Sequence, residues 1–160
     1  MVATISGLRN AAQASAYYDA DDYYSEDGHA PSVWLGKGAV ELGLASAVDS
    51  ERFTRLLHGQ INKDQRLGTS QDGEWVHRPG WDVTFSAPKS VSIMALVAGD
   101  RRLIGAHDEA VRRTMALAEQ HFAATRIRED GEVRREVTQN LVIARFRHGT
   151  SRARKRVVSG

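Results

Sequence analysis

All four tyrosines of this 160-residue sequence lie within eight consecutive positions, as two adjacent pairs. Tyr17 and Tyr18 form the first pair, Tyr23 and Tyr24 the second, and three aspartates lie between them. A buried segment would not carry this charge, because an unpaired carboxylate is costly to remove from water. A phenolic oxygen with a base or cation nearby can attack phosphorus and hold a covalent DNA end. The alternative is a surface aromatic cluster that only packs on the domain.

Two further residues could assist such a reaction. Asp82 lies on the polar face of a strand expected over 80–88, where its carboxylate could accept a phenol proton or orient a metal-bound histidine. Otherwise it is an ordinary solvated position. His148 ends a strand expected over 140–148 and could bind a metal, although a single histidine is a weak signal. The remaining histidines, at 29, 58, 77, 107 and 121, show no ligand spacing with it.

Periodicity and turn signals predict the elements that must position these residues. Asp49 or Ser50 can cap a helix over 49–61, and apolar residues at a period near 3.6 predict a long helix over 100–124. Asp130-Gly131 predicts a hairpin turn between 126–129 and 132–137. Further helices are expected over 10–18 and 86–97, and loops over 19–32 and 62–80. The apolar stripe of the long helix comprises Ile104, His107 or Asp108, Val111, Met115, Ala118 and Phe122.

This order of elements indicates an α+β fold, an antiparallel β-sheet with flanking helices. The chain has no cysteine, no apolar run long enough to cross a membrane and no recognisable secretion signal, so we expect a cytoplasmic protein with no membrane partner. Residues 126–160 carry ten basic residues against four acidic ones, which is typical of a nucleic-acid partner or of a solvated tail.

Several sequence blocks together resemble the N-terminal relaxase domain of MobF-type conjugative relaxases, the TrwC/TraI type. Besides the tyrosine pairs, the blocks are Trp34-Leu35-Gly36-Lys37-Gly38, Glu41-Leu42-Gly43-Leu44, Asp82 to Ser92, Asn140-Leu141-Val142 and Phe146 to Arg152. They follow the family order and cover nearly the whole chain to Arg152. The resemblance implies a five-stranded antiparallel sheet with flanking helices, shared with HUH replication-initiator nucleases.

The resemblance also implies an activity. Such enzymes bind a DNA hairpin beside an origin of transfer and nick one strand by tyrosine transesterification, which leaves a 5′-phosphotyrosine link. Tyr17 and Tyr23 match the nucleophiles, Tyr18 and Tyr24 their companions, and Asp82 the assisting acid. His148 matches the first of three histidines that bind a divalent metal, Mg or Mn. Further expected partners are single-stranded DNA and other relaxosome proteins, and the side chains expected to bind DNA are Lys89, Arg145, Arg147 and Arg152.

The sequence departs from the family after Arg152. The family continues with an acidic residue and then a His-x-His pair, whereas this sequence has Ala153 and a basic run to Gly160. We therefore expect residues 1–152 to form the N-terminal part of a relaxase domain and 153–160 to form a divergent tail. We also expect the chain to be truncated, with a sheet that is incomplete at the C-terminus. DNA cleavage should then be weak or absent, because one imidazole holds a catalytic ion poorly.

Two other interpretations stay open at this point. The first is a non-catalytic DNA-binding module, in which the basic segment 145–156 binds phosphates without cleaving them. The second is an unfolded remnant without activity, which cooperative thermal unfolding would exclude.

Overall fold

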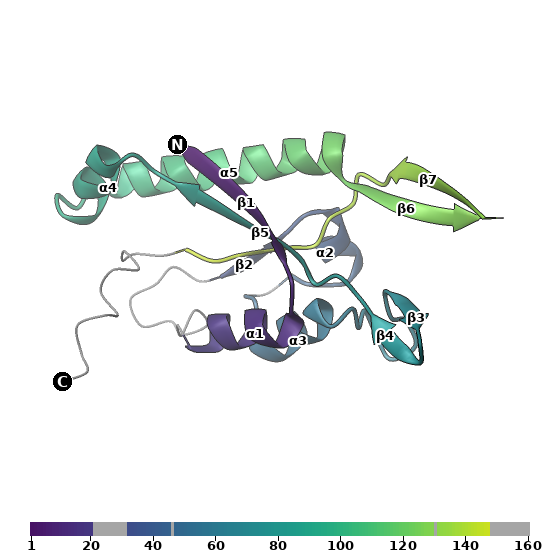
Figure 1. The fold of residues 1–160 in the computed structure, drawn as a ribbon. Helices are drawn as coiled ribbons and strands as arrows, with labels where there is room; N and C mark the ends of the chain where they lie inside the picture. Colours follow the sequence, from purple (N-terminus) through teal and green to yellow (C-terminus); the bar gives the residue numbers. More distant parts are fainter. Residues whose placement is uncertain (21–31, 46, 130, 148–160) are drawn as a thin grey trace.

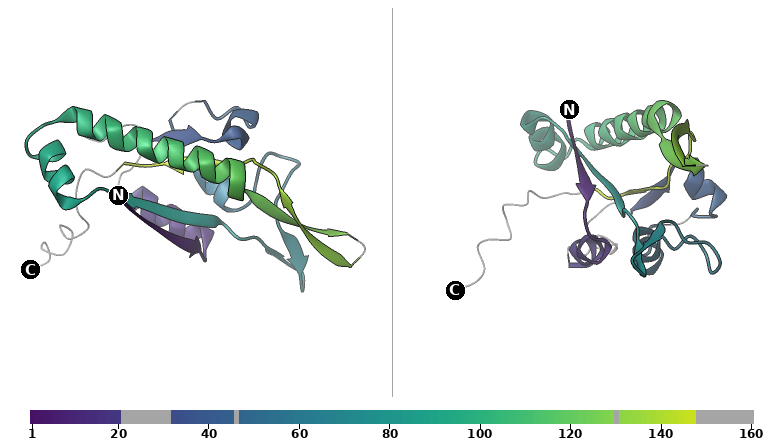
Figure 2. Two further views of the ribbon diagram at one scale, coloured as in Figure 1. Left: turned by 90° about the horizontal axis from the view of Figure 1, so that it is seen from above. Right: turned by 45° about the vertical axis from the view of Figure 1, so that its right-hand side comes forward.

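The computed structural model describes residues 1–20, 32–45, 47–129 and 131–147. The long helix α5 (Arg101–Phe122) lies along one side of the paired strands β1 (Val2–Leu8) and β5 (Gly80–Ser86). Helices α1 (Ala11–Ala20) and α3 (Ser50–Leu57) lie on the opposite side (Figures 1 and 2). No helix of the described residues is long and apolar enough to span a membrane. The arrangement is a helix–strand–helix sandwich.

The described strands pair in four two-stranded antiparallel ladders. Besides β1 with β5, they are β2 (Val33–Leu35) with β8 (Ile143–Arg145), β3 (Thr69–Gln71) with β4 (Glu74–Val76), and β6 (Ala124–Glu129) with β7 (Glu132–Val137). The expected α+β class is confirmed. The single five-stranded sheet is not, because the described strands do not join into one ladder.

The β1–β5 ladder separates a polar face from an apolar one. Asp82 pairs with Ser6, whereas Trp81 pairs with Gly7 and Val83 with Ile5. Directly paired residues of an antiparallel ladder share a face, so Asp82 and Ser6 lie on the polar side. The predicted alternation along this strand is confirmed.

Most of the expected helices form, with shifted ends. The Asp49 carboxylate accepts a hydrogen bond from the Arg52 amide at 2.7 Å, which caps α3 as predicted. The helix ends at Leu57 rather than at residue 61, because Gly59 adopts a left-handed conformation with a φ of 77°, which stops the helix. Helix α4 (Lys89–Leu96) begins only after Pro88.

The expected apolar stripe of α5 is partly wrong. Val111 is buried, and Ile104, Met115 and Ala118 are half-buried, as the stripe predicts. Phe122 is 72% exposed, because it is the last residue of the helix and little of the described structure covers its ring.

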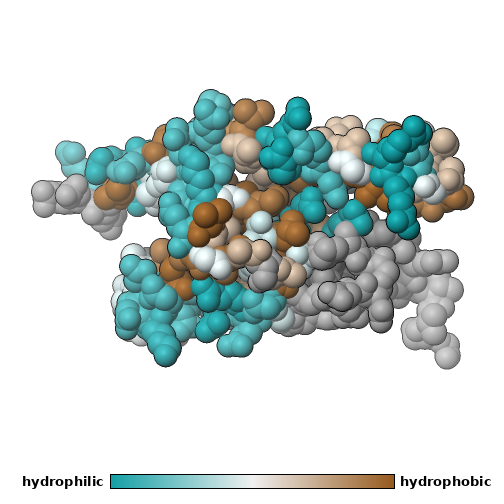
Figure 3. All heavy atoms as spheres, turned by 180° about the vertical axis from the view of Figure 1, so that it is seen from behind, coloured by the Kyte–Doolittle hydropathy of each residue, from teal (hydrophilic) through white to brown (hydrophobic). Residues whose placement is uncertain are grey.

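The core is small. Phe53 and Leu57 of α3 pack against Ala11 and Ala14 of α1, together with Val48. Apolar patches interrupt the polar surface of the face shown in Figure 3. Stability therefore depends on few contacts.

The loop expected over 62–80 contains the β3–β4 hairpin. Its turn is Asp72-Gly73, and both residues have positive φ, as a tight hairpin turn requires. Trp75 Nε1 donates a hydrogen bond to the Leu67 carbonyl at 2.8 Å, and the Arg66 guanidinium lies over the Trp75 ring. These contacts anchor the hairpin to the segment that follows α3.

The imidazole of His77 gives this anchor a pH dependence. Burial lowers the pKa of His77 below its ordinary value, and the nearby charges of Arg66 and His58 lower it further. Below pH 6.5 the unfolded chain therefore binds a proton that the folded protein resists. The free energy of unfolding should fall as pH falls through this value towards the lower native pKa.

Urea unfolding between pH 7.5 and 5 should show this decline in the parent and a shallower decline in His77→Gln. His58→Gln should give an intermediate slope, because it removes one of the three causes. Parallel pH profiles for the parent and His77→Gln would contradict the assignment.

Candidate functional site

The core brings the tyrosine helix next to the end of the last described strand. Ala14 of α1 is buried in the core, and Ser15 Oγ accepts a hydrogen bond from Thr54 Oγ1 of α3 at 3.1 Å. Phe146, which follows β8, packs edge-on against Phe53 with ring centroids 5.4 Å apart. Segments more than 120 residues apart in the sequence thus contact the same face of α3.

Asp82 is connected to the same core through β1. Its partner Ser6 precedes Leu8 by two residues, and Leu8 packs against the core immediately before α1 begins. Asp82 itself is half-buried. The strand that pairs with Asp82, the helix that carries the first tyrosine pair and the segment that leads to His148 therefore meet at one cluster of apolar side chains.

The expected reacting groups themselves are only partly described. The backbone of Tyr17 and Tyr18 lies in the second half of α1, whereas Tyr23, Tyr24 and His148 lie outside the described residues. The domain boundary expected at residue 152 also lies outside the described residues. The roles of the four tyrosines and of His148 remain predictions.

The described residues do not form a metal site. They contain no group of three histidine, cysteine, aspartate or glutamate side chains that could hold an ion. The donor set on this part of the chain does not fit the three-histidine site that the resemblance implies, and we derive no chemical step through a metal.

A buried carboxylate that is not among the predicted site residues joins two of the motif blocks. Glu119 of α5 is 7% exposed, and its Oε1 accepts hydrogen bonds from the amides of Lys37 and Leu141, both at 2.8 Å. The Gly38 amide donates to the Leu141 carbonyl at 3.0 Å. Because Leu141 is engaged in this way, only Ile143–Arg145 of the expected strand 140–148 pair as β8.

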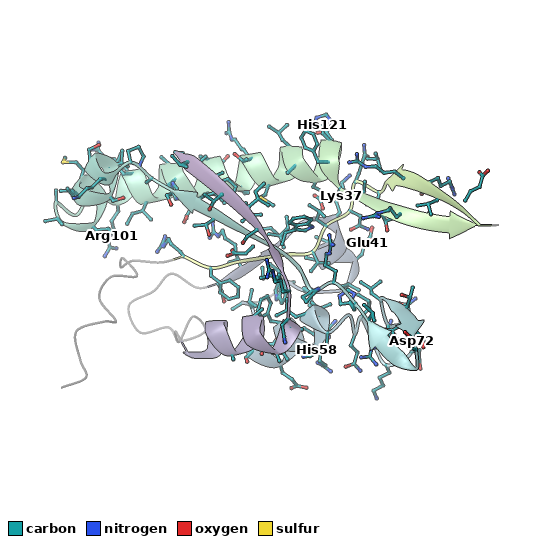
Figure 4. All side chains as sticks on the ribbon, viewed as in Figure 1. Lys37, Glu41, His58, Asp72, Arg101 and His121 are labelled. Carbon is teal, nitrogen blue, oxygen red and sulfur yellow. The ribbon has the colours of Figure 1, made fainter. Side chains whose placement is uncertain are left out.

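The clamp around Glu119 also fixes the short helix α2 (Lys37–Glu41). Asn140 Nδ2 donates a hydrogen bond to Glu41 Oε2 at 2.7 Å. Figure 4 labels Lys37 and Glu41 on this helix, beside the strand that enters β8. The sequence held one signal for the clamp, since position 119 follows Met115 by four residues and so lies beside the apolar stripe of α5.

The residues expected to bind DNA have different environments. Lys89 is exposed at the first position of α4, and Arg152 lies outside the described residues. Arg147 donates a hydrogen bond to Asp108 of α5 at 3.1 Å, and Arg145 lies 3.6 Å from the same carboxylate. Their guanidinium groups are thus paired within the protein, and their contact with DNA remains a prediction.

Comparison with known proteins identifies relatives over most of the chain. Residues 11–155 match the TrwC relaxase family. The multifunctional conjugation protein TraI of Escherichia coli K12 is 46% identical over 149 residues, which are 93% of this chain and 8% of that protein.

Solved structures give the same answer. A metal-bound structure of the conjugative relaxase TrwC in complex with oriT DNA aligns with a TM-score of 0.81 at 44% identity and covers 96% of this chain. A copper-bound TrwC structure aligns with a TM-score of 0.77 at 48% identity, so relatives in this family bind a metal. The chain spans about half the length of these solved chains, 53% in both cases. The agreement of family, sequence and fold shows that this chain belongs to the TrwC relaxase family.

Proposed function

We propose that this chain forms the strand-binding and nucleophile-bearing part of a conjugative relaxase. One observation carries the proposal: α1, which bears Tyr17, and the segment leading to His148 contact the same apolar core, beside the strand that carries Asp82. Relatives of known structure are described as complexes of TrwC with oriT DNA and with a 27-mer that contains the recognition hairpin and the cleavage site. We infer the same class of DNA partner here, and we propose the cytoplasm as the place of action.

The proposed reaction is a transesterification. The phenolic oxygen of Tyr17 forms a bond to the scissile phosphorus and the bond from phosphorus to the 3′ oxygen breaks. The phosphorus keeps its bond to the 5′ oxygen, so that strand end is now linked to the tyrosine. Asp82 accepts the phenol proton, and the departing 3′ oxygen takes up a proton from water. Tyr23 provides a second nucleophile for a later transfer, and Tyr18 and Tyr24 accompany the two nucleophiles. The family resemblance implies a divalent metal, Mg or Mn, and no step of the proposed reaction runs through it.

Replacing Tyr17 by phenylalanine should abolish covalent attachment while leaving DNA binding intact. The probe is a radiolabelled 27-mer with a hairpin and a cleavage site, incubated with magnesium or manganese, and the adduct is measured on denaturing gels. We expect an adduct from the parent and none from Tyr17→Phe, because the phenolic oxygen is the proposed nucleophile. An equal adduct from both proteins would overturn the nucleophile assignment, and a parent that binds no DNA would overturn the function.

The second candidate is a non-catalytic DNA-binding module. Arg145 of β8 and Arg147 after it favour this candidate, because these two guanidinium groups face only one carboxylate, that of Asp108. Binding that persists in Tyr17→Phe, Tyr23→Phe together with complete absence of an adduct from the parent would support this candidate. Phosphate contacts predict that the affinity weakens steeply as salt rises.

A further inference from the structure

One carboxylate on α5 holds two of the arginines expected to bind DNA. Asp108 Oδ2 lies 3.1 Å from Arg147 Nη1, and Asp108 Oδ1 lies 3.6 Å from Arg145 Nη1. Strand β8, which carries Arg145, and the residues that follow it run below α5 in Figure 1. The Arg147 side chain is 33% exposed and that of Asp108 is 25% exposed, so the cluster is open to a ligand from solvent.

The charges within this cluster do not balance. Two guanidinium groups face one carboxylate, which leaves a net charge of +1. Arg145 Nε is buried and has no hydrogen-bond partner in the part of the chain that the structure describes. A buried donor without a partner is costly, so the cluster has unused capacity to bind an anion.

We propose that Asp108 substitutes for a DNA phosphate within the free protein and is displaced from Arg145 and Arg147 when a phosphodiester binds. Carboxylate and phosphate present similar pairs of oxygens to a guanidinium group, so one can replace the other. This inference rests on the proposed function, because it concerns how the same DNA-binding surface is regulated. Asp108 acts as an internal competitor that weakens sequence-independent binding.

A second acidic residue on α5 provides a matched control. Glu109 also pairs with two arginines, Arg112 at 2.7 Å and Arg113 at 2.6 Å. All three of these residues lie on the same helix, and no described strand contributes to the cluster. Glu109→Gln therefore removes the same charge as Asp108→Asn without releasing the arginines at 145 and 147.

The test measures the anisotropy of a fluorescein-labelled 30-mer of thymidine against protein concentration at several salt concentrations. Asp108→Asn should bind about two- to fivefold more tightly than the parent, since a partly exposed ion pair contributes up to this factor. Its log–log salt dependence should be steeper by about 0.7 for each phosphate gained. Glu109→Gln should change the affinity less than about twofold at 0.15 M salt, where exposed charges are screened. Adding Arg147→Gln to Asp108→Asn should remove the gain.

Each other outcome overturns the inference. Equal gains in Asp108→Asn and Glu109→Gln would mean a general charge effect. Weaker binding by Asp108→Asn with a lower melting temperature would mean that Asp108 only anchors the strand. If the parent binds and Asp108→Asn does not gain, this inference alone fails, whereas failure of both proteins to bind removes the proposed function as well. Should Asp108→Asn not fold, Arg147→Gln must still bind the 30-mer more weakly than the parent does. An affinity of Arg147→Gln equal to that of the parent would overturn the inference.

Discussion

Replacing Glu119 by alanine should lower the free energy of unfolding by about 2–4 kcal/mol. The substitution leaves the amides of Lys37 and Leu141 without their acceptor, and a buried donor that loses its partner costs about 1–3 kcal/mol. The loss should appear in urea unfolding followed by circular dichroism. Hydrogen exchange should accelerate at the two released amides before the rest of the protein opens.

Two control variants separate the acceptor from the helix position. Glu119→Gln keeps an oxygen that accepts both amides and should lose only about 1 kcal/mol, because a neutral acceptor forms a weaker hydrogen bond. Gln120→Ala, at the exposed neighbouring position of the same helix, should change stability by less than about 0.5 kcal/mol. If Glu119→Ala and Gln120→Ala unfold alike, the clamp does not stabilise the fold.

The position of Glu119 explains why its loss should matter for the site. Its two hydrogen bonds span 82 and 22 residues of sequence and join α5 to the start of α2 and to the approach to β8. That approach leads through Phe146 to His148. The clamp before β8 and the Phe53–Phe146 contact after it therefore fix the segment between Leu141 and Phe146.

The sequence predicted elements whose signals are local. The cap at Asp49, the period of α5 and the Asp130-Gly131 dipeptide are local signals, and α3, α5 and the paired strands β6 and β7 formed as they predict. The alternation around Asp82 also placed this residue on the correct face of its strand.

The elements that were missed depend on partners distant in sequence. Strand β1 is exposed along nearly its whole length and carries little apolar pattern, so its pairing with β5, about 80 residues away, defines it. The β3–β4 hairpin did carry a local signal, Asp72-Gly73, which is the same dipeptide as Asp130-Gly131. The surrounding segment is rich in glycine and polar residues, which favours a loop over paired strands.

The motif blocks propose Tyr17, Asp82 and His148 from residue types alone, and the roles of these residues stay predictions. The internal pairing of the candidate site could not be predicted in this way. Nothing local indicates that Arg147 contacts Asp108, because 39 residues separate them. An acidic residue within the apolar stripe of α5 was the available hint, since a carboxylate on a half-buried face requires a partner.

Gly38→Ala tests the same junction through packing rather than hydrogen bonding, and it should cost about 1–3 kcal/mol. A Cβ at Gly38 would lie 2.5 Å from Asn140 Oδ1 and 2.9 Å from both the Leu141 carbonyl oxygen and Val142 Cγ2. Residues 140–142 would have to move away from α2, which would weaken the Asn140–Glu41 hydrogen bond.

Gly105→Ala on α5 separates this crowding from helix propensity. A Cβ at Gly105 meets nothing within 4 Å, so alanine there should stabilise the protein by about 0.5–1 kcal/mol through its better helix propensity. Both glycines lie in helices, hence propensity alone predicts stabilisation at both positions. If urea unfolding shows that Gly38→Ala lowers and Gly105→Ala raises the free energy of unfolding, contact with residues 140–142 outweighs helix propensity at Gly38. Stabilisation by both substitutions would contradict the close approach of α2 to the segment that enters β8.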